Sequence, residues 1–134
     1  MNRKITFIRV CYWVCAIFEL LAVIPMLSPK LFGLIMGIQD FNPGSDYNYA
    51  MGVAASFALG WVLLLFWAVR RPVERKGVLL LTIVPVFIGN MLSGIYAVSS
   101  GLLKAATVFP SLVMQVIIIV AFGLGYYYAG KLEK

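Results

Sequence analysis

Residues 5–27 read ITFIRVCYWVCAIFELLAVIPML, an apolar run long enough to cross a membrane as one helix. At a rise of about 1.5 Å per residue, about 20 residues span a hydrocarbon core of about 30 Å. Three further runs of similar length follow at residues 48–69, 77–98 and 108–129. The sequence therefore predicts an all-α integral membrane protein, with residues 1–134 forming a single transmembrane domain built as a four-helix bundle.

The composition agrees with this prediction. Of the 134 residues, 63% are hydrophobic, 12% are charged and none is histidine. A soluble domain carries about 25% charged residues, and a disordered chain combines low hydrophobicity with high net charge, so both classes are excluded. Histidine is the commonest transition-metal ligand and a frequent general base, so its absence disfavours metal sites and hydrolase triads. We expect no enzymatic activity, no cofactor and no metal.

The basic residues are distributed unevenly between the segments that separate the four runs. Nine of the eleven lie at the N-terminal end, in the second connection at 70–76 and in the tail with Lys131 and Lys134. Only Lys30 and Lys104 lie in the other two connections. Cytoplasmic segments carry the excess of Lys and Arg, so both termini are predicted to be cytoplasmic. Topology and anionic lipid headgroups account for the net charge of +6, and no nucleic-acid partner is expected.

The connection at residues 28–47 holds one irregular element. Its segment 31–38, LFGLIMGI, is too short to span the membrane and too apolar for a free loop. The turn-forming residues 42–45 follow it. We expect a short apolar segment in this first outer loop that is interfacial or re-entrant. It either packs as a plug or covers a site as a lid.

Small residues recur at a spacing of four in three of the runs. Lipid provides no hydrophobic force between helices, so helices approach closely where small residues line one face. We therefore expect packing along these ladders, within the chain or against a second protomer. The principal positions are Gly52, Gly60, Gly89, Ser93 and Gly125.

Each run also carries one polar side chain about 11–13 Å from the outer boundary: Glu19, Ser56, Asn90 and Gln115. Glu19 is the only acidic residue inside a run, and a carboxyl in hydrocarbon costs several kcal/mol unless it is neutral or partnered. Arg9 lies about 15 Å nearer the cytoplasm, so desolvation favours the protonated carboxyl. We expect a ligand-binding pocket of these four residues, or a hydrogen-bond network that sets the helix register.

A diffuse pattern consists of Pro29, Gly33 and Gly37 after the first run, Gly52, WAVRRPVER at 67–75, and Gly89. With this pattern the chain resembles a broad class of bacterial four-helix inner-membrane proteins without an assigned activity. The resemblance implies a bacterial inner-membrane location.

The segment 16–19, AIFE, is similar to the first span of the small multidrug resistance transporters. These transporters also have four helices and one essential Glu in the first of them. The likeness is one of architecture, because the first outer loop of this chain is longer than theirs and its third run lacks their glycine-rich pattern.

Taken together, these features predict a small polytopic membrane protein. The leading hypothesis is binding or transport of a hydrophobic or cationic small molecule, or of a lipid, at an outward-facing polar level centred on Glu19. The alternative is a non-catalytic accessory or assembly subunit, in which the glycine ladders face another copy of the chain or a different membrane protein. The two hypotheses differ in what co-purifies: a ligand or a stoichiometric protein.

Overall fold

The computed structural model describes residues 3–132, which are helical with no strand in that range, and 84% of the structure is helix. Four helical stretches are long and apolar enough to cross a membrane: Arg3–Leu27, Ser45–Val69, Gly77–Ser99 and Ala105–Leu132. They cover the four predicted runs and extend beyond them by at most three residues. By the length and composition of its helices, the chain is a multi-pass membrane protein.

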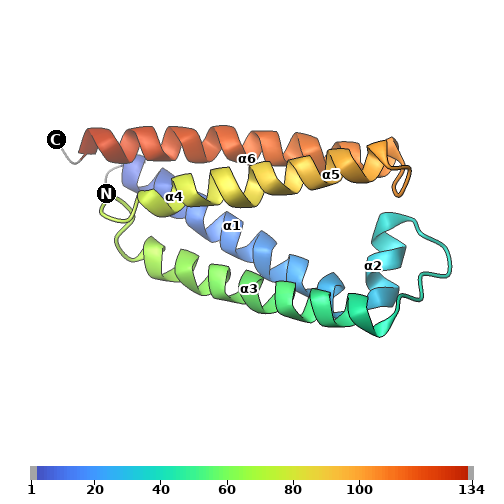
Figure 1. The fold of residues 1–134 in the computed structure, drawn as a ribbon. Coiled ribbons are helices and arrows are strands. Elements are labelled where there is room, and N and C mark those ends of the chain that lie inside the picture. The colour runs from blue at the N-terminus through green and yellow to red at the C-terminus, as the bar shows by residue number, and fades with distance from the viewer. Residues whose placement is uncertain (1–2, 133–134) are drawn as a thin grey trace.

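Within the described residues, seven helical elements make up these spans and their connections. In chain order they are α1 (Arg3–Leu27), α2 (Pro29–Met36), α3 (Ser45–Val69), α4 (Gly77–Leu81), η1 (Thr82–Ile88), α5 (Gly89–Ser99) and α6 (Ala105–Leu132). The third span is the continuous succession of α4, η1 and α5, whereas α2 is a short helix in the first connection (Figure 1).

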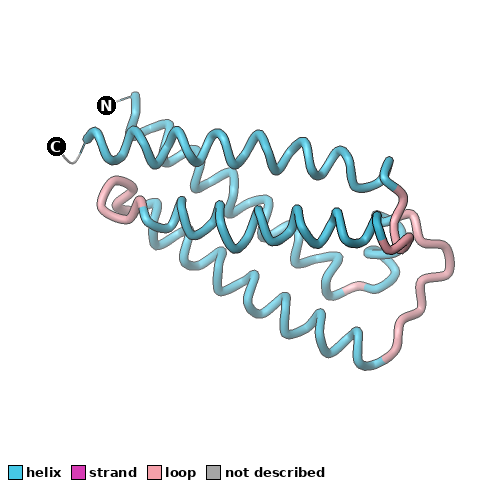
Figure 2. Tube along the Cα trace, turned by 45° about the horizontal axis from the view of Figure 1, so that its top comes forward, coloured by secondary structure: helices cyan, strands magenta, loops and turns pink. Residues whose placement is uncertain are grey.

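The four spans form two pairs that diverge along the molecule. One pair is α1 with α3, and the other is the third span with α6 (Figure 1). The pairs meet at the end that holds both termini, here called the terminal end, and separate towards the opposite end, here called the loop end (Figure 2). The bundle is therefore closed over only part of its length.

The buried core fills the terminal half of the bundle. Its members come from all four spans: Ile8, Cys11, Tyr12, Cys15, Ala16, Leu65, Ala68, Val78, Leu79, Phe87, Ile118, Phe122 and Ala129. On α1 they recur every three or four residues, because a turn takes about 3.6 residues and one stripe faces the neighbouring helices. In lipid, this core stabilises the fold through close packing rather than through removal of apolar surface from water.

The two pairs come closest where α6 passes α1 and α4. Gly125 is buried there, and a Cβ on it would lie 3.4 Å from Leu79 Cδ1 and 4.0 Å from Ile8 Cγ1. About one turn away, Cys11 Sγ donates to Ala121 O at 3.9 Å. Both distances are ordinary van der Waals contacts, so at this level α6 packs against α1 and α4.

The other predicted ladder positions have no such contact within the chain. Gly52, Gly60 and Gly89 have open space where a Cβ would stand. Ser93 is exposed, and its hydroxyl donates to Gly89 O of the same helix at 3.0 Å. Of the five principal positions, all within the described range, Gly125 alone is buried. In agreement with the divergence of the pairs, α5 contains no buried residue.

The third span contains a wide helical turn. Residues 82–88 form a π-helix with Pro85 inside it. Proline lacks an N–H group and its ring crowds the preceding turn, and a wider turn accommodates both effects. The hydroxyl of the fully buried Thr82 donates to Val78 O at 2.7 Å where this segment begins. The wide turn changes which way the residues of α5 point, compared with a regular α-helix.

A polar contact ties α1 to the connection between α3 and α4. Tyr12 is fully buried, and its hydroxyl donates to Arg75 O at 2.9 Å. The Arg75 guanidinium lies 3.6 Å over the Trp67 ring and donates to Trp67 O. The connection is therefore held by α1 on one side and by the end of α3 on the other.

Replacing Tyr12 with Phe removes this hydrogen bond, and the Arg75 carbonyl keeps the bond that it accepts from Val78 N at 3.0 Å. We expect a loss of about 1 kcal/mol in the free energy of unfolding, seen as a lower thermal midpoint of the purified protein in mild detergent. Tyr49→Phe is the matched control, because Tyr49 is 77% exposed. Equal midpoints for the two variants would contradict the role given to Tyr12.

Candidate functional site

Glu19 continues the buried stripe of α1 past the end of the core. It follows Cys15 and Ala16, both fully buried, by one turn, and precedes the buried Val23 by another. Glu19 itself is half-buried. Its carboxyl forms no hydrogen bond or ion pair with any residue in the range 3–132. An acidic side chain without a partner thus lies on the inner stripe of α1, where the closed part of the bundle ends.

Gln115 lies at the corresponding depth on α6, which runs antiparallel to α1. Ile8 of α1 lies next to Gly125 of α6 and serves as a common reference level. Glu19 comes eleven residues after Ile8, and Gln115 comes ten residues before Gly125, so both lie in the same direction from that level. With about 1.5 Å per residue in both helices, the two positions differ in depth by about one residue. Gln115 is half-buried and lies between the buried Val108 and Ile118 along α6. Gln115 therefore lies at the same level of the bundle as Glu19.

The amide of Gln115 is only partly satisfied. Its Nε2 donates to Ser111 Oγ of the same helix at 3.0 Å. Its Oε1 is buried and has no donor. A buried amide oxygen without a hydrogen bond is costly in an apolar environment, so this atom can accept a donor that a ligand or a protonated carboxyl supplies.

Ser56 and Asn90, the other two members of the predicted pocket, are exposed. Ser56 Oγ donates to Gly52 O of its own helix at 3.0 Å. The side-chain amide of Asn90 makes no hydrogen bond to the part of the chain that the structure describes. Asn90 is the second residue after the π-helical segment, whose wide turn alters its direction. The structure thus brings Glu19 and Gln115 to one level of the interior and does not draw Ser56 and Asn90 into it.

At the loop end, α2 reaches from one helix pair to the other. It begins directly after α1, where Ser28 Oγ accepts a hydrogen bond from Leu31 N at 3.5 Å as an N-cap. It ends at Gly37, whose φ of +67° is the left-handed conformation that glycine adopts without strain. A Cβ on Gly37 would lie 4.0 Å from Thr107 Oγ1 of α6. The helix therefore crosses the loop end of the molecule (Figure 1).

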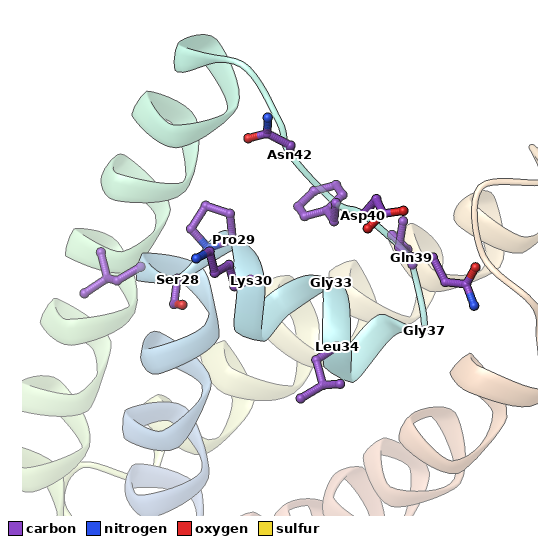
Figure 3. A pocket seen from close by; sticks show the side chains of 12 residues that line it. Ser28, Pro29, Lys30, Gly33, Leu34, Gly37, Gln39, Asp40 and Asn42 are labelled. Atoms are coloured by element: carbon purple, nitrogen blue, oxygen red, sulfur yellow. The ribbon is translucent and has the colours of Figure 1, made fainter.

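A cavity of about 1040 Å³ lies beside α2 and the return loop that leads to α3 (Figure 3). All its lining residues fall between Leu27 and Asn42, and they include Lys30, Gln39 and Asp40. The sequence singles out this segment by its apolar run and its turn residues, but nothing in the pattern marks these polar residues as a site. A second, apolar groove of about 650 Å³ lies between α5 and α6 at the same end.

Replacing Gln115 with Met removes the unpaired oxygen and nearly preserves the volume of the side chain. We expect a thermal midpoint equal to or above that of the wild type, because a buried polar atom without a partner opposes folding by about 1 kcal/mol. The measurement is thermal unfolding in detergent without added ligand. A clear loss of stability would instead mean that Gln115 Oε1 is satisfied in the folded protein.

The chain was compared with models of protein families, with curated proteins and with solved structures, and nothing matched. No relative therefore assigns a role to Glu19, to Gln115 or to the cavity beside α2. The roles proposed below depend on the positions, burial and hydrogen bonding of these residues.

Proposed function

We propose that this chain is a multi-pass protein of a bacterial inner membrane that binds a hydrophobic or cationic small molecule, or a lipid, at the level of Glu19. The supporting observation is that Glu19 and Gln115 lie at one depth on the inner stripes of two helices. The Glu19 carboxyl and Gln115 Oε1 both lack a partner within residues 3–132. Placing ionisable or polar side chains inside a membrane costs free energy, so such residues are functional-site candidates by default.

We further propose that both termini are cytoplasmic and that the level of Glu19 is open to the outer side. The basic residues support this orientation, since only Lys30 and Lys104 lie at the loop end. Those at the terminal end are Arg3, Lys4, Arg9, Arg70, Arg71, Arg75, Lys76 and Lys131. Lys134 lies outside the described residues. Cytoplasmic segments of membrane proteins carry this excess of positive charge.

The chemistry that we assign to this level is binding, with no catalytic step. A carboxyl in a low-dielectric setting rests in its protonated form and can donate a hydrogen bond. When a cation enters, the carboxyl loses its proton and pairs with the ligand, because an unpaired charge would be costly there. In this proposal α2, which crosses the loop end, acts as a lid rather than as a packing plug.

A non-catalytic accessory or assembly subunit is the second candidate, and the surface of α3 favours it. Gly52, Ser56 and Gly60 recur every four residues on one stripe, and the two glycines have open space at their Cβ positions. Stripes of small residues allow another transmembrane helix to approach closely. The occupant of that stripe would be a second copy of the chain or a different membrane protein.

Glu19→Gln tests the first candidate, because it keeps the shape of the side chain and removes the titratable group. We expect cationic amphiphiles to raise the thermal midpoint of the wild type by several degrees, and more at about pH 9 than at about pH 5. The larger effect at high pH follows because the ionised carboxyl binds the cation. Glu19→Gln should lose this stabilisation at every pH.

Glu74→Gln is the matched control for that experiment. Glu74 is an exposed acid whose partner is Arg71 at 3.1 Å, in the connection between α3 and α4. It should respond to the amphiphiles as the wild type does. The proposed role of Glu19 fails if the wild type, Glu19→Gln and Glu74→Gln are all stabilised equally.

Gly60→Ile tests the second candidate. Apart from the neighbouring backbone of α3, no atom of residues 3–132 would lie within 4 Å of a Cβ at this position, so the variant should fold with a thermal midpoint close to that of the wild type. If the stripe is an interface, the variant should lose a stoichiometric partner, or a dimer, that purifies with the wild type. Retention of the same partner or the same oligomeric state by Gly60→Ile would exclude this stripe as the interface.

A further inference from the structure

The open cavity beside α2 is lined by one stretch of chain that packs on itself. The rings of Phe32, Phe41 and Tyr47 contact one another at centroid distances between 5.2 and 5.9 Å, which joins α2, the return loop and the start of α3. A Cβ on Gly33 would come within 2.6 Å of Phe41 Cβ, so the glycine permits the loop to lie directly on α2. These contacts hold the loop in place and preform the cavity.

Two charges of opposite sign line this cavity. Lys30 belongs to the first turn of α2, and Asp40 belongs to the return loop that runs alongside it (Figure 3). Neither side chain forms an ion pair or a hydrogen bond with the described residues, 3–132. The amides of Gln39 and Asn42 also line the cavity. The cavity therefore offers one cation, one anion and neutral hydrogen-bonding groups to a ligand.

The position of the cavity matches the depth of phospholipid headgroups. Its lining starts at Leu27, the last residue of α1, and ends at Asn42, just before α3 begins at Ser45. These two helices are about 37 Å long at 1.5 Å per residue, so their ends extend past a hydrocarbon core of about 30 Å. Leu34 and Ile35 of α2 are 77% and 52% exposed, and apolar side chains at such a boundary insert among acyl chains.

We propose that α2 and the return loop bind the headgroup of a zwitterionic phospholipid that carries a primary ammonium, of the phosphatidylethanolamine type. Lys30 pairs with the phosphate, and the Asp40 carboxylate accepts hydrogen bonds from the ammonium. The amides of Gln39 and Asn42 bond to the remaining headgroup oxygens, and Leu34 contacts the acyl chains. This site is separate from Glu19, so it does not rest on the function proposed above.

The chemistry of the lining distinguishes this headgroup from two common alternatives. A primary ammonium offers three N–H donors to Asp40, whereas the quaternary ammonium of phosphatidylcholine offers none and is bound best by a cage of aromatic rings. Among the described residues that line the cavity, Phe41 is the only aromatic one. Phosphatidylglycerol shares the phosphate that Lys30 binds but supplies no cation to Asp40.

The test measures binding of three lipids to the full chain in mild detergent by native mass spectrometry. The lipids have the same acyl chains and carry ethanolamine, choline or glycerol headgroups. We expect the wild type to bind the ethanolamine lipid about fivefold more tightly than the other two, a factor typical of one exposed charge pair. Asp40→Asn should abolish this preference, and Lys30→Gln should weaken binding of all three lipids.

Asp46→Asn and Lys104→Gln are the matched controls, because they make the same charge changes at the loop end outside the cavity lining. Both should retain the preference of the wild type, and so should Glu19→Gln if the two sites are separate. Equal affinity of the wild type for the three headgroups would overturn the proposal, as would equal effects of Asp40→Asn and Asp46→Asn.

Competition with soluble glycerophosphoethanolamine distinguishes whether the ligand is a lipid or a free phosphoester. It carries the same headgroup without acyl chains, so it should compete with the lipid only weakly. Binding as tight as that of the lipid would contradict a membrane source for the ligand.

Discussion

The contact of α1 with both helix pairs at the terminal end is the interaction on which the remaining structure depends. The stripe of buried residues on α1, which includes Ile8 and Tyr12, lies against α3 on one side and α6 on the other. Lipid provides no hydrophobic force between helices, so this contact relies on packing around the buried Gly125 and on the hydrogen bond from Tyr12 to the Arg75 carbonyl. On α1 the core cluster ends at Ala16, and beyond that level the half-buried Glu19 is followed by the buried Val23.

The sequence was sufficient to predict the spans, because a backbone in hydrocarbon must satisfy its own hydrogen bonds and a helix must match the membrane thickness. It was less informative about the direction of side chains. Counting residues gives a depth for Glu19, Ser56, Asn90 and Gln115, but depth does not determine which face of a helix is buried. The π-helical turn at Pro85 changes the direction of Asn90, and Ser56 satisfies its hydroxyl on its own backbone.

The cavity beside α2 illustrates a different limit of prediction. The apolar run predicts an interfacial or re-entrant segment in the first connection, and the structure shows a short helix there, capped by Ser28 and begun by Pro29. Lys30 lies in the first turn of α2 and Asp40 lies in the return loop, and no sequence pattern relates the two charges to each other. They share a cavity only because Phe41 folds back onto Gly33, a contact between residues eight positions apart. The two proposed sites thus use charge in different settings, one within the hydrocarbon and one among headgroups.

The divergence of the helix pairs also gives the molecule a tapered outline, narrower at the terminal end and wider at the loop end (Figure 2). A tapered body displaces more area in one leaflet of a bilayer than in the other. Lipids around it must then tilt or thin locally, and this elastic stress is lower where the membrane already bends in the same sense. The angle between the two helix pairs therefore sets how differently the protein displaces area in the two leaflets.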